Sequence, residues 1–337
     1  MGTSVATIVL NWNGKDFLES CLPDLKAQSY PSHRILVVDN GSEDGSQMWL
    51  RGTYPEVELI ETYDNIGFAE ANNVGIRRAL EDPEVGYIAL VNNDTRIEPE
   101  WVATLVETLE RGDGFGAAQS PLVFDHDPDL INSLGIAIEP SLWAFDDGCF
   151  EENSGLTEKE IFGVTGGACL FSREMVEDLM VGGSFFDPRF FSYYEDVDVA
   201  FRARLKGWRA LLVPAPVVRH HGSGTGSRQL HRKVFMLERN HWMYVIKNVP
   251  LRIFIARLPQ FIKKRVSRIV HWLRPPSLRM LFWSIRGNLA WIPRLPYLLR
   301  ARRSTGGDRK ALEKALSLRA GEKETEAVPT EKVKVAE

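Results

Sequence analysis

The stretch that decides the fold reads YIALVNNDT, at residues 87–95. Its first part, residues 87–91, is an apolar run of the kind that forms a buried strand. Two amides and the carboxylate of Asp94 follow, and residues 96–101 then carry the acidic side chains and the proline typical of a first helical turn. Ligands bind at the carboxyl ends of strands in open α/β sheets. The stretch therefore indicates either such a ligand-binding edge or an Asx-type turn that caps a helix.

Earlier parts of the chain repeat this pattern of an apolar run followed by a helix. Further strands are predicted at residues 5–10, 34–38 and 57–60, and apolar residues recur at helical spacing over residues 17–25. Alternation of strands and helices predicts a parallel, Rossmann-like sheet with helices on both faces. The dinucleotide-binding fingerprint G-x-G-x-x-G does not follow the first strand.

Each of these four strands ends in asparagine or aspartate. The candidates are, in chain order, Asn11, Asn13, Asp39, Asn65, Asn72, Asn93 and Asp94. One such residue is more often part of a turn than a ligand. Four strand ends in series favour a shared polar pocket, in which Asp39 is suited to accept hydrogen bonds from a base or ribose. Asp94 is suited to hold a hard divalent cation between diphosphate oxygens.

The pattern changes after residue 112. Residues 116–171 are rich in glycine, aspartate and turn residues, with short β-like runs at 136–138 and 161–164. An irregular segment with a hairpin is expected there. Gly166 and Gly167 interrupt an apolar run where backbone could approach a ligand closely, although a tight turn beside a packed strand explains them equally well.

An aromatic-rich loop then delivers three carboxylates, Glu195, Asp196 and Asp198, to the start of a helix that Gly207 ends. Acidic residues at a helix start commonly compensate the helix dipole. The flanking aromatic side chains also suit sugar binding, and a carboxylate there could deprotonate an acceptor hydroxyl. The Gly/Ser-rich run at 217–228, with its paired histidines, has the composition of a mobile lid over phosphates or of a solvated linker.

The net charge of −4 hides a strong asymmetry. Residues 1–250 contain 21 basic and 38 acidic residues, a net of −17, whereas residues 251–303 contain 13 Lys and Arg and no Asp or Glu. Residues 304–337 contain seven of each sign and are predicted to be disordered, apart from a helix at 308–319. Two parts of opposite charge are expected to face different partners.

The basic segment follows a predicted helix at 229–249 and mixes tryptophan, leucine and arginine, with prolines between. Basic amphipathic helices lie in the headgroup plane of anionic membranes. Nucleic acid is a less suitable partner because the acidic body would repel it. A third interpretation is packing on the domain or on a second subunit, which leaves a homo-oligomer open.

The sequence predicts neither export nor a membrane-spanning helix. No run of about 18 apolar residues predicts a spanning helix, and the N-terminus lacks the pattern of a signal peptide. Three widely spaced cysteines suggest no disulfide framework and no zinc site, and fit a reducing compartment. We therefore expect a cytoplasmic protein.

Taken together, the motifs resemble the inverting family 2 glycosyltransferases of the GT-A fold, in particular the bacterial rhamnosyltransferase-like branch. The resemblance covers about residues 5–228 and is carried, in family order, by residues 8–14, 37–42, 65–75, 92–94, 166–168, 194–198 and 220–224. It implies a GT-A domain over 1–228, with a donor-binding half to about residue 112 and an acceptor half from 113. Residues 229–303 would form a helical, basic extension.

The resemblance also implies roles for single residues. Asp39 would contact the nucleobase, and Asn11, Asn13, Asn65, Asn72 and Asn93 would shape the donor pocket. Asp94 would be the aspartate of the D-x-D motif that binds Mg²⁺ or Mn²⁺, with Asn92 at the motif's first position, and His220, or else His221, would complete the metal or diphosphate site. Asp196, or else Glu195, would be the catalytic base, and the acceptor would contact Gly166, Gly167, Tyr194 and Asp198.

The implied reaction is inverting transfer of a sugar, rhamnose as a first guess, from a nucleotide-diphosphate donor. The acceptor would be a glycan or lipid-linked glycan in cell-envelope polysaccharide synthesis, reached from the inner face of the cell membrane. A different reading is a catalytically weak scaffold that binds nucleotide-sugars at the membrane; the intact Asp94, Asp196 and His220 favour the enzyme. A nucleotidyltransferase would need a Gly-rich basic loop after the first strand, which residues 11–14 (NWNG) do not form.

Overall fold

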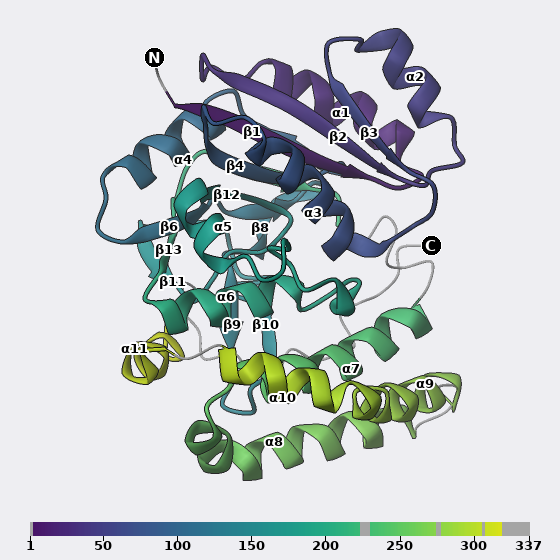
Figure 1. Ribbon diagram of the computed structural model, residues 1–337, viewed down its shortest axis with the longest axis vertical. Coiled ribbons are helices and arrows are strands. Elements are labelled where there is room, and N and C mark those ends of the chain that lie inside the picture. The colour runs from purple at the N-terminus through teal and green to yellow at the C-terminus, as the bar shows by residue number, and fades with distance from the viewer. Residues whose placement is uncertain (1–2, 223–229, 274–277, 305–306, 319–337) are drawn as a thin grey trace.

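The computed structural model describes residues 3–222, 230–273, 278–304 and 307–318, and an eight-stranded sheet forms its centre (Figure 1). The strand order is β11-β13-β6-β12-β4-β1-β2-β3. The strands are β1 Ser4–Asn11, β2 His33–Asn40, β3 Glu58–Thr62, β4 Val85–Asn92, β6 Phe115–Gln119, β11 Lys159–Ile161, β12 Ala168–Ser172 and β13 Arg209–Leu212.

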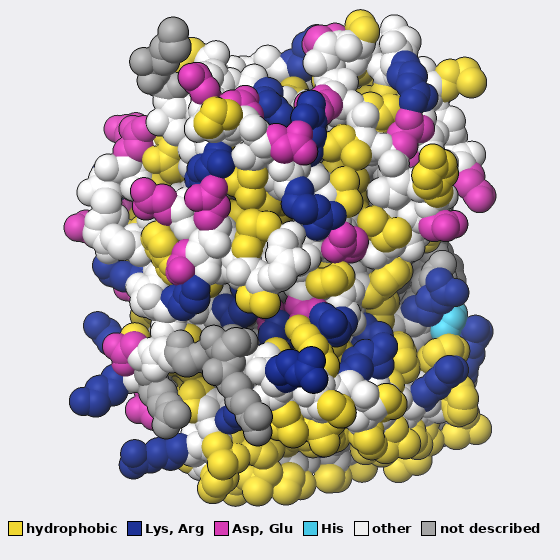
Figure 2. All heavy atoms as spheres, in the orientation of Figure 1, with side chains coloured by type: hydrophobic (Ala, Val, Ile, Leu, Met, Phe, Trp, Pro, Cys, Tyr) yellow, Lys and Arg dark blue, Asp and Glu magenta, His cyan; other side chains and the backbone are white. Residues whose placement is uncertain are grey.

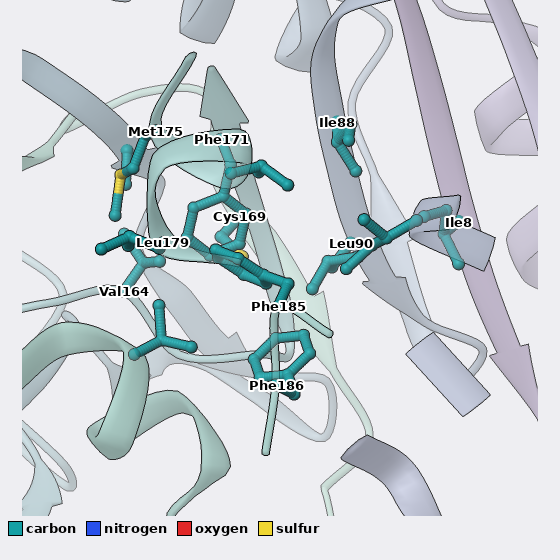
Figure 3. Close-up of a cluster of buried hydrophobic side chains, with 14 of the residues drawn as sticks. Ile8, Ile88, Leu90, Val164, Cys169, Phe171, Met175, Leu179, Phe185 and Phe186 are labelled. Carbon is teal, nitrogen blue, oxygen red and sulfur yellow. The ribbon is translucent and has the colours of Figure 1, made fainter. Parts of the chain in front are cut away.

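The first four strands pair in parallel, as the alternating sequence pattern predicts. Their side chains alternate between two cores: Ala6 and Ile8 enter one cluster, Val5 and Val9 the other. The second cluster is covered by α1 Lys15–Lys26 and α4 Trp101–Glu110, and the first by α3 Gly67–Leu80 and α5 Arg173–Leu179. Figure 3 shows the first cluster, where Ile8, Ile88 and Leu90 face Phe185 and Phe186. Helices on both faces are thus confirmed.

The other half of the sheet corrects the expectation of a purely parallel arrangement. Strand β12 runs antiparallel to both β4 and β6, and β11 runs antiparallel to β13. The segment predicted to be irregular also holds β7 Leu122–Phe124, β8 Asp127–Ser133, β9 Ile136–Ile138 and β10 Ala144–Asp146. Most of these strands are only three residues long, too short for an alternating pattern to show in the sequence.

A second sheet, in the order β5-β14-β7-β8, corrects the expected helix start after Asp94. Residues Thr95–Ile97 form strand β5, and α4 begins only at Trp101. β5 pairs antiparallel with β14, Val218–His220, so that His220 lies opposite Thr95. The segment after β4 therefore pairs with a strand more than 120 residues later in the chain, and this pairing places His220 beside Asp94.

The C-terminal helices gather at one end of the molecule, next to α6 Glu195–Lys206 and away from β1–β3 (Figure 1). They are α7 Leu230–Asn248, α8 Leu251–Trp272, α9 Leu278–Leu289, α10 Leu295–Ser304 and α11 Arg309–Ala315. The predicted helix at 229–249 is confirmed as α7. Residues 223–228 of the predicted lid and residues 319–337 of the predicted tail lie outside the described residues.

Buried ion pairs fasten this extension to the body. Lys247 of α7 donates to Asp187 at 2.9 Å and to Asp198 at 3.0 Å, and all three side chains are buried. Tyr194, which precedes α6, and Phe201 of α6 pack in one cluster with Met243 and Tyr244 of α7. Part of the extension therefore packs on the domain itself. Across the described segments, no helix combines the length and apolar character needed to cross a bilayer.

Candidate active site

A cleft of about 950 Å³ lies where the strands β1, β2 and β4 end. One wall comes from the strand ends and includes Asn65, Asn93 and Asp94. Gly166, Gly167, Glu195 and Asp196 also line the cleft, with the Gly167 carbonyl accepting from the Asn92 amide at 2.7 Å, and residues of α7 and α9 complete the lining. The topology explains this arrangement, because the carboxyl ends of the parallel strands meet at one edge of the sheet.

Three of the predicted donor residues organise the loops beneath this wall. Asn11 is fully buried, and its Nδ2 donates to Asp39 Oδ2 at 2.8 Å and to Ser46 Oγ at 3.0 Å. Asp39 is also fully buried, and its Oδ1 accepts from the Ser42 amide and from Gln47 Nε2. The exposed Asn13 accepts from the Glu43 amide at 2.7 Å. None of Asn11, Asn13 and Asp39 lines the cleft.

The remaining predicted donor residues divide between the cleft and the core. Asn65 lines the cleft, and its Oδ1 accepts from the Gly67 amide at 3.0 Å. Asn93 also lines it, and its Nδ2 donates to Asn11 Oδ1 at 2.8 Å. Asn72 is buried within α3, where it donates to the Phe68 carbonyl at 2.9 Å and does not reach the cleft.

The antiparallel pairing of β5 with β14 brings Asp94 and His220 together. His220 Nε2 lies 3.2 Å from Asp94 Oδ1, and His220 Nδ1 lies 2.9 Å from Asn132 Oδ1. Burial favours the neutral forms, but the contact outweighs it: the pKa of Asp94 is lowered and the pKa of His220 is raised. His221 faces elsewhere, since its ring packs on Phe17 at 5.2 Å. His220 is therefore the histidine of this pair.

Asp94 and His220 supply only some of the ligands that a divalent cation needs. Within the part of the chain that the structure describes, no group of three or more His, Cys, Asp or Glu side chains is arranged to hold a metal. A carboxylate and an imidazole supply two ligands, so phosphate oxygens and water would have to complete the shell. Asp146 lines the same cleft, and the crowding of protein atoms around it raises the pKa of its carboxyl.

Two carboxylates at the start of α6 face the cleft. Asp196 is half-buried; its Oδ1 accepts from the Val197 amide at 2.8 Å and its Oδ2 from the Gly166 amide at 3.4 Å. Burial raises the pKa of Asp196 to about 6. Glu195 is more deeply buried, and burial followed by the charge of Asp196 raises its pKa further. Its Oε2 has no hydrogen-bond partner among the described residues.

The loop before α6 is strained in a way that aims these carboxylates. Phe191, Tyr193 and Tyr194 all have positive φ angles, of 68°, 70° and 70°. Residues other than glycine rarely adopt this backbone conformation, and it persists only where the surrounding packing enforces it. Gly67 lies directly against this loop: a Cβ there would come within 2.6 Å of the Phe191 carbonyl oxygen. The close approach fixes the loop against the start of α3.

Residues 4–180 match the family model described as Glycosyl transferase family 2, which is more than half of the chain. The chain belongs to that family. The glycosyltransferase is 27% identical over 303 residues to a Mycobacterium tuberculosis protein named N-acetylglucosaminyl-diphospho-decaprenol L-rhamnosyltransferase, covering 84% of this chain and 89% of that one. It is 21% identical over 209 residues to the low-salt glycan biosynthesis hexosyltransferase Agl10 of Haloferax volcanii, covering 59% and 61% of the two chains.

Solved structures show that the glycosyltransferase has the GT-A fold. The mannosyltransferase PcManGT of Pyrobaculum calidifontis, in complex with GDP-Man and Mn²⁺, superposes with a TM-score of 0.54 at 19% identity, over 94% of this chain and 88% of that one. TarS of S. aureus superposes with a TM-score of 0.56 at 14% identity, over 93% and 55%.

Two of the predicted acceptor contacts, Asp198 and Tyr194, do not line the cleft in the structure of the glycosyltransferase. Asp198 is 0% exposed and accepts from Arg202 Nε at 3.0 Å as well as from Lys247. Tyr194 is 5% exposed and stacks on Tyr244, with ring centroids 5.3 Å apart. Neither side chain lines the cleft; both hold α6 to α7. Their partners in the extension, Lys247 and Tyr244, lie far along the chain, so local sequence could not reveal these contacts.

Sequence reasoning missed a basic and aromatic part of the cleft. Arg232, Lys233 and Arg239 of α7 line it together with Trp283 of α9 and Arg294. The basic excess visible in the sequence lies at residues 251–303 and includes only Arg294 of these cations. Arg232, Lys233 and Arg239 precede that segment, and only the tertiary fold shows that they line the cleft with Arg294.

Proposed function

We propose that the glycosyltransferase moves a sugar, with rhamnose as the first candidate, from a nucleotide-diphosphate donor to a lipid-linked glycan acceptor, with inversion. The observation that carries this proposal is the shared cleft, which is lined by both the Asp94–His220 pair and Asp196. The name of the M. tuberculosis relative, whose acceptor is a sugar on a decaprenyl diphosphate, supports the acceptor class and the rhamnose donor.

In this reaction Asp196 is the base. Its carboxylate takes the proton of the acceptor hydroxyl while the hydroxyl oxygen attacks the anomeric carbon. The bond from that carbon to the diphosphate oxygen breaks, and the nucleoside diphosphate leaves with the electron pair. A single displacement from the opposite face inverts the anomeric centre. The raised pKa of Asp196 makes it a stronger base than an exposed aspartate.

Asp94 and His220 are placed to hold a divalent cation with the donor diphosphate. When bound, such an ion offsets the charge that develops on the leaving group. Two structures with the same fold, PcManGT with GDP-Man and GalNAc-T7 with UDP and GalNAc, also contain Mn²⁺, which supports this assignment. Asn65 and Asn93 offer polar groups to the donor. A contact of Asp39 with the nucleobase would require one of its hydrogen bonds, to Gln47 or Asn11, to be exchanged for the base.

The outer face of the extension supports a position on an anionic membrane. Exposed apolar side chains follow helical spacing along α8, as Ile255, Ile262, Val266 and Val270, and along α9, as Leu278, Phe282, Ile285 and Leu289. Figure 2 shows this apolar surface along the end of the molecule formed by α8, with Lys and Arg close by. Exposed cations on the same helices, such as Arg252, Lys263 and Arg279, suit anionic headgroups.

The test is donor binding followed by transfer. The purified protein is heated with dTDP-, UDP- and GDP-sugars, each with Mn²⁺, Mg²⁺ or EDTA, and the best donor is then offered a synthetic lipid-diphosphate N-acetylglucosamine. A metal-dependent rise in melting temperature with one nucleotide class, and glycosylated product from it, are expected. Donor binding without transfer to this or other lipid-linked glycans would favour the scaffold interpretation instead.

A further inference from the structure

The cleft also contains a cationic wall, which we define as Arg232, Lys233, Arg239 and Arg294. All four line the same cleft as Asp94 and Asp196. Three come from α7 and the fourth follows α9, so none belongs to the strand ends that form the donor side. Cations collected in one cleft of a molecule whose body has an excess of acidic residues call for a specific explanation.

No salt bridge involves the cationic wall within the segments that the structure describes. Arg239 is only 7% exposed, and its Nε and Nη2 donate to Asn240 Oδ1 and to the Phe190 carbonyl, both uncharged. Arg294 donates to the carbonyl of Ala290. Burial lowers the pKa of Lys233, and burial with the nearby charge of Arg294 lowers the pKa of Arg239 to about 10. The nearby charge of Asp146 acts on Lys233 in the opposite sense, whereas the charge that acts on the buried Arg239 is the cation of Arg294. An anionic ligand would therefore stabilise the two arginines.

The position of the wall indicates which anion it receives. In the proposed function the donor diphosphate binds at Asp94 and His220, which come from the turn after β4 and from β14 and not from α7 or the segment after α9. Helix α9 packs on α7, which carries most of the wall, and it also carries part of the exposed apolar face: Trp283 lines the cleft, while Phe282 and Ile285 are exposed. A ligand that reaches the wall over α9 therefore comes from the surface that we assign to the membrane.

We infer that the cationic wall binds the diphosphate of the lipid-linked acceptor, and so holds the acceptor sugar toward Asp196. Arginine suits this task because its planar guanidinium donates two parallel hydrogen bonds to phosphate oxygens. Trp283 and Phe235, which also line the cleft, offer apolar contact to the first part of the lipid. This inference rests on the proposed function and names the part of the site that would select a diphosphate-linked acceptor.

Direct binding tests the wall without depending on catalysis. Decyl diphosphate is titrated into the wild-type protein and into the double variant Arg232→Gln/Arg294→Gln by calorimetry. EDTA is present so that no metal can bridge the ligand to Asp94. Arg239 is left intact because it also holds Phe190 and Asn240 in place. We expect the double variant to bind about 10- to 100-fold more weakly, since two charged hydrogen-bond donors are lost.

The matched control is Arg300→Gln, which removes an exposed cation of α10 that does not line the cleft. Its affinity for decyl diphosphate is expected to equal that of the wild type. Equal affinity of the wild type and the double variant, or an equal loss in Arg300→Gln, would overturn the inference.

Steady-state kinetics separate this inference from the proposed function. In the double variant, KM for the lipid-diphosphate acceptor should rise by a similar factor, while KM for the nucleotide-sugar stays unchanged. A rise confined to the donor KM would assign the wall to the donor diphosphate and overturn the inference, with the proposed function intact. The inference and the proposed function could also fail separately. If the double variant lost decyl diphosphate binding but the wild type transferred no sugar, the anion site would stand and the proposed function would be rejected.

Discussion

The body, residues 3–222, and the helical extension, residues 230–318, differ in where they place apolar and charged side chains. Of the 18 large hydrophobic side chains exposed among the described residues, 13 belong to the extension, and the five in the body are scattered. The body holds the acidic excess, and its carboxylates at strand and helix ends line the cleft. The extension supplies cations to the cleft on its inner side and an apolar surface on its outer side. In the proposed function, the body carries out the chemistry and the extension brings a charged, lipid-bearing substrate to it.

The largest expected effect is at the base in the body. Asp196→Asn should lower kcat by about 10²- to 10⁴-fold, because proton removal from the acceptor is lost while the shape is kept. Initial rates of sugar transfer, with donor binding measured in parallel, give the answer. Asp16→Asn is the matched control, since Asp16 is an exposed aspartate at the start of α1. Full activity in a folded Asp196→Asn protein would remove the assignment.

The second effect concerns the metal pair. Asp94→Asn should abolish the metal-dependent part of nucleotide binding and lower kcat on the order of 10²-fold, because the cation offsets several kcal/mol of developing charge. The melting temperature is measured with the nucleoside diphosphate, with and without Mn²⁺. If Mn²⁺ stabilised the variant as much as the wild type, the ion would have to bind elsewhere.

The third prediction sets the two surfaces against each other. Ile262→Asp/Phe282→Asp changes two side chains that are 52% and 59% exposed on the extension, whereas Met48→Asp changes one that is 81% exposed on the body. Each lost apolar contact with lipid should weaken binding about 10-fold or more. Sedimentation with anionic vesicles measures this loss.

Only the double variant is expected to lose vesicle binding, and it should keep its transfer activity with a short-chain acceptor. Equal binding by both variants would mean that the apolar face meets another partner, such as a second copy of the chain. Light scattering of the vesicle-free protein would then show the dimer.

The smallest effect is in the pH dependence of the body. A base works when deprotonated, so kcat should fall by about tenfold per unit below about pH 6, where Asp196 takes up a proton. The same raised pKa means that folding favours the protonated carboxyl, so its contribution to stability is present at low pH and is lost as the pH rises through about 6. Asp196→Asn should therefore raise the melting temperature at pH 8 but not at pH 4.

The sequence predicted the body better than the extension, for physical reasons. Strand ends that carry Asn65, Asn93 and Asp94 converge because parallel topology leaves them little choice. The Asp94–His220 contact depends on a three-residue strand that looked like a helix start. Asp198 and Tyr194 looked like cleft residues because their buried partners, such as Lys247, lie far along the chain. Local patterns cannot show which of two faces of a helix is turned inward by tertiary packing.

The measurement that tests the central claim most directly is the anomeric configuration of the first product. The wild-type enzyme is given its best nucleotide-sugar and the lipid-diphosphate acceptor, and the coupling constants of the new linkage are read by NMR before hydrolysis or further transfer. A single displacement with Asp196 as base predicts inversion relative to the donor. Retention of configuration would contradict it, because two displacements, and a nucleophile that this cleft does not assign, would then be needed.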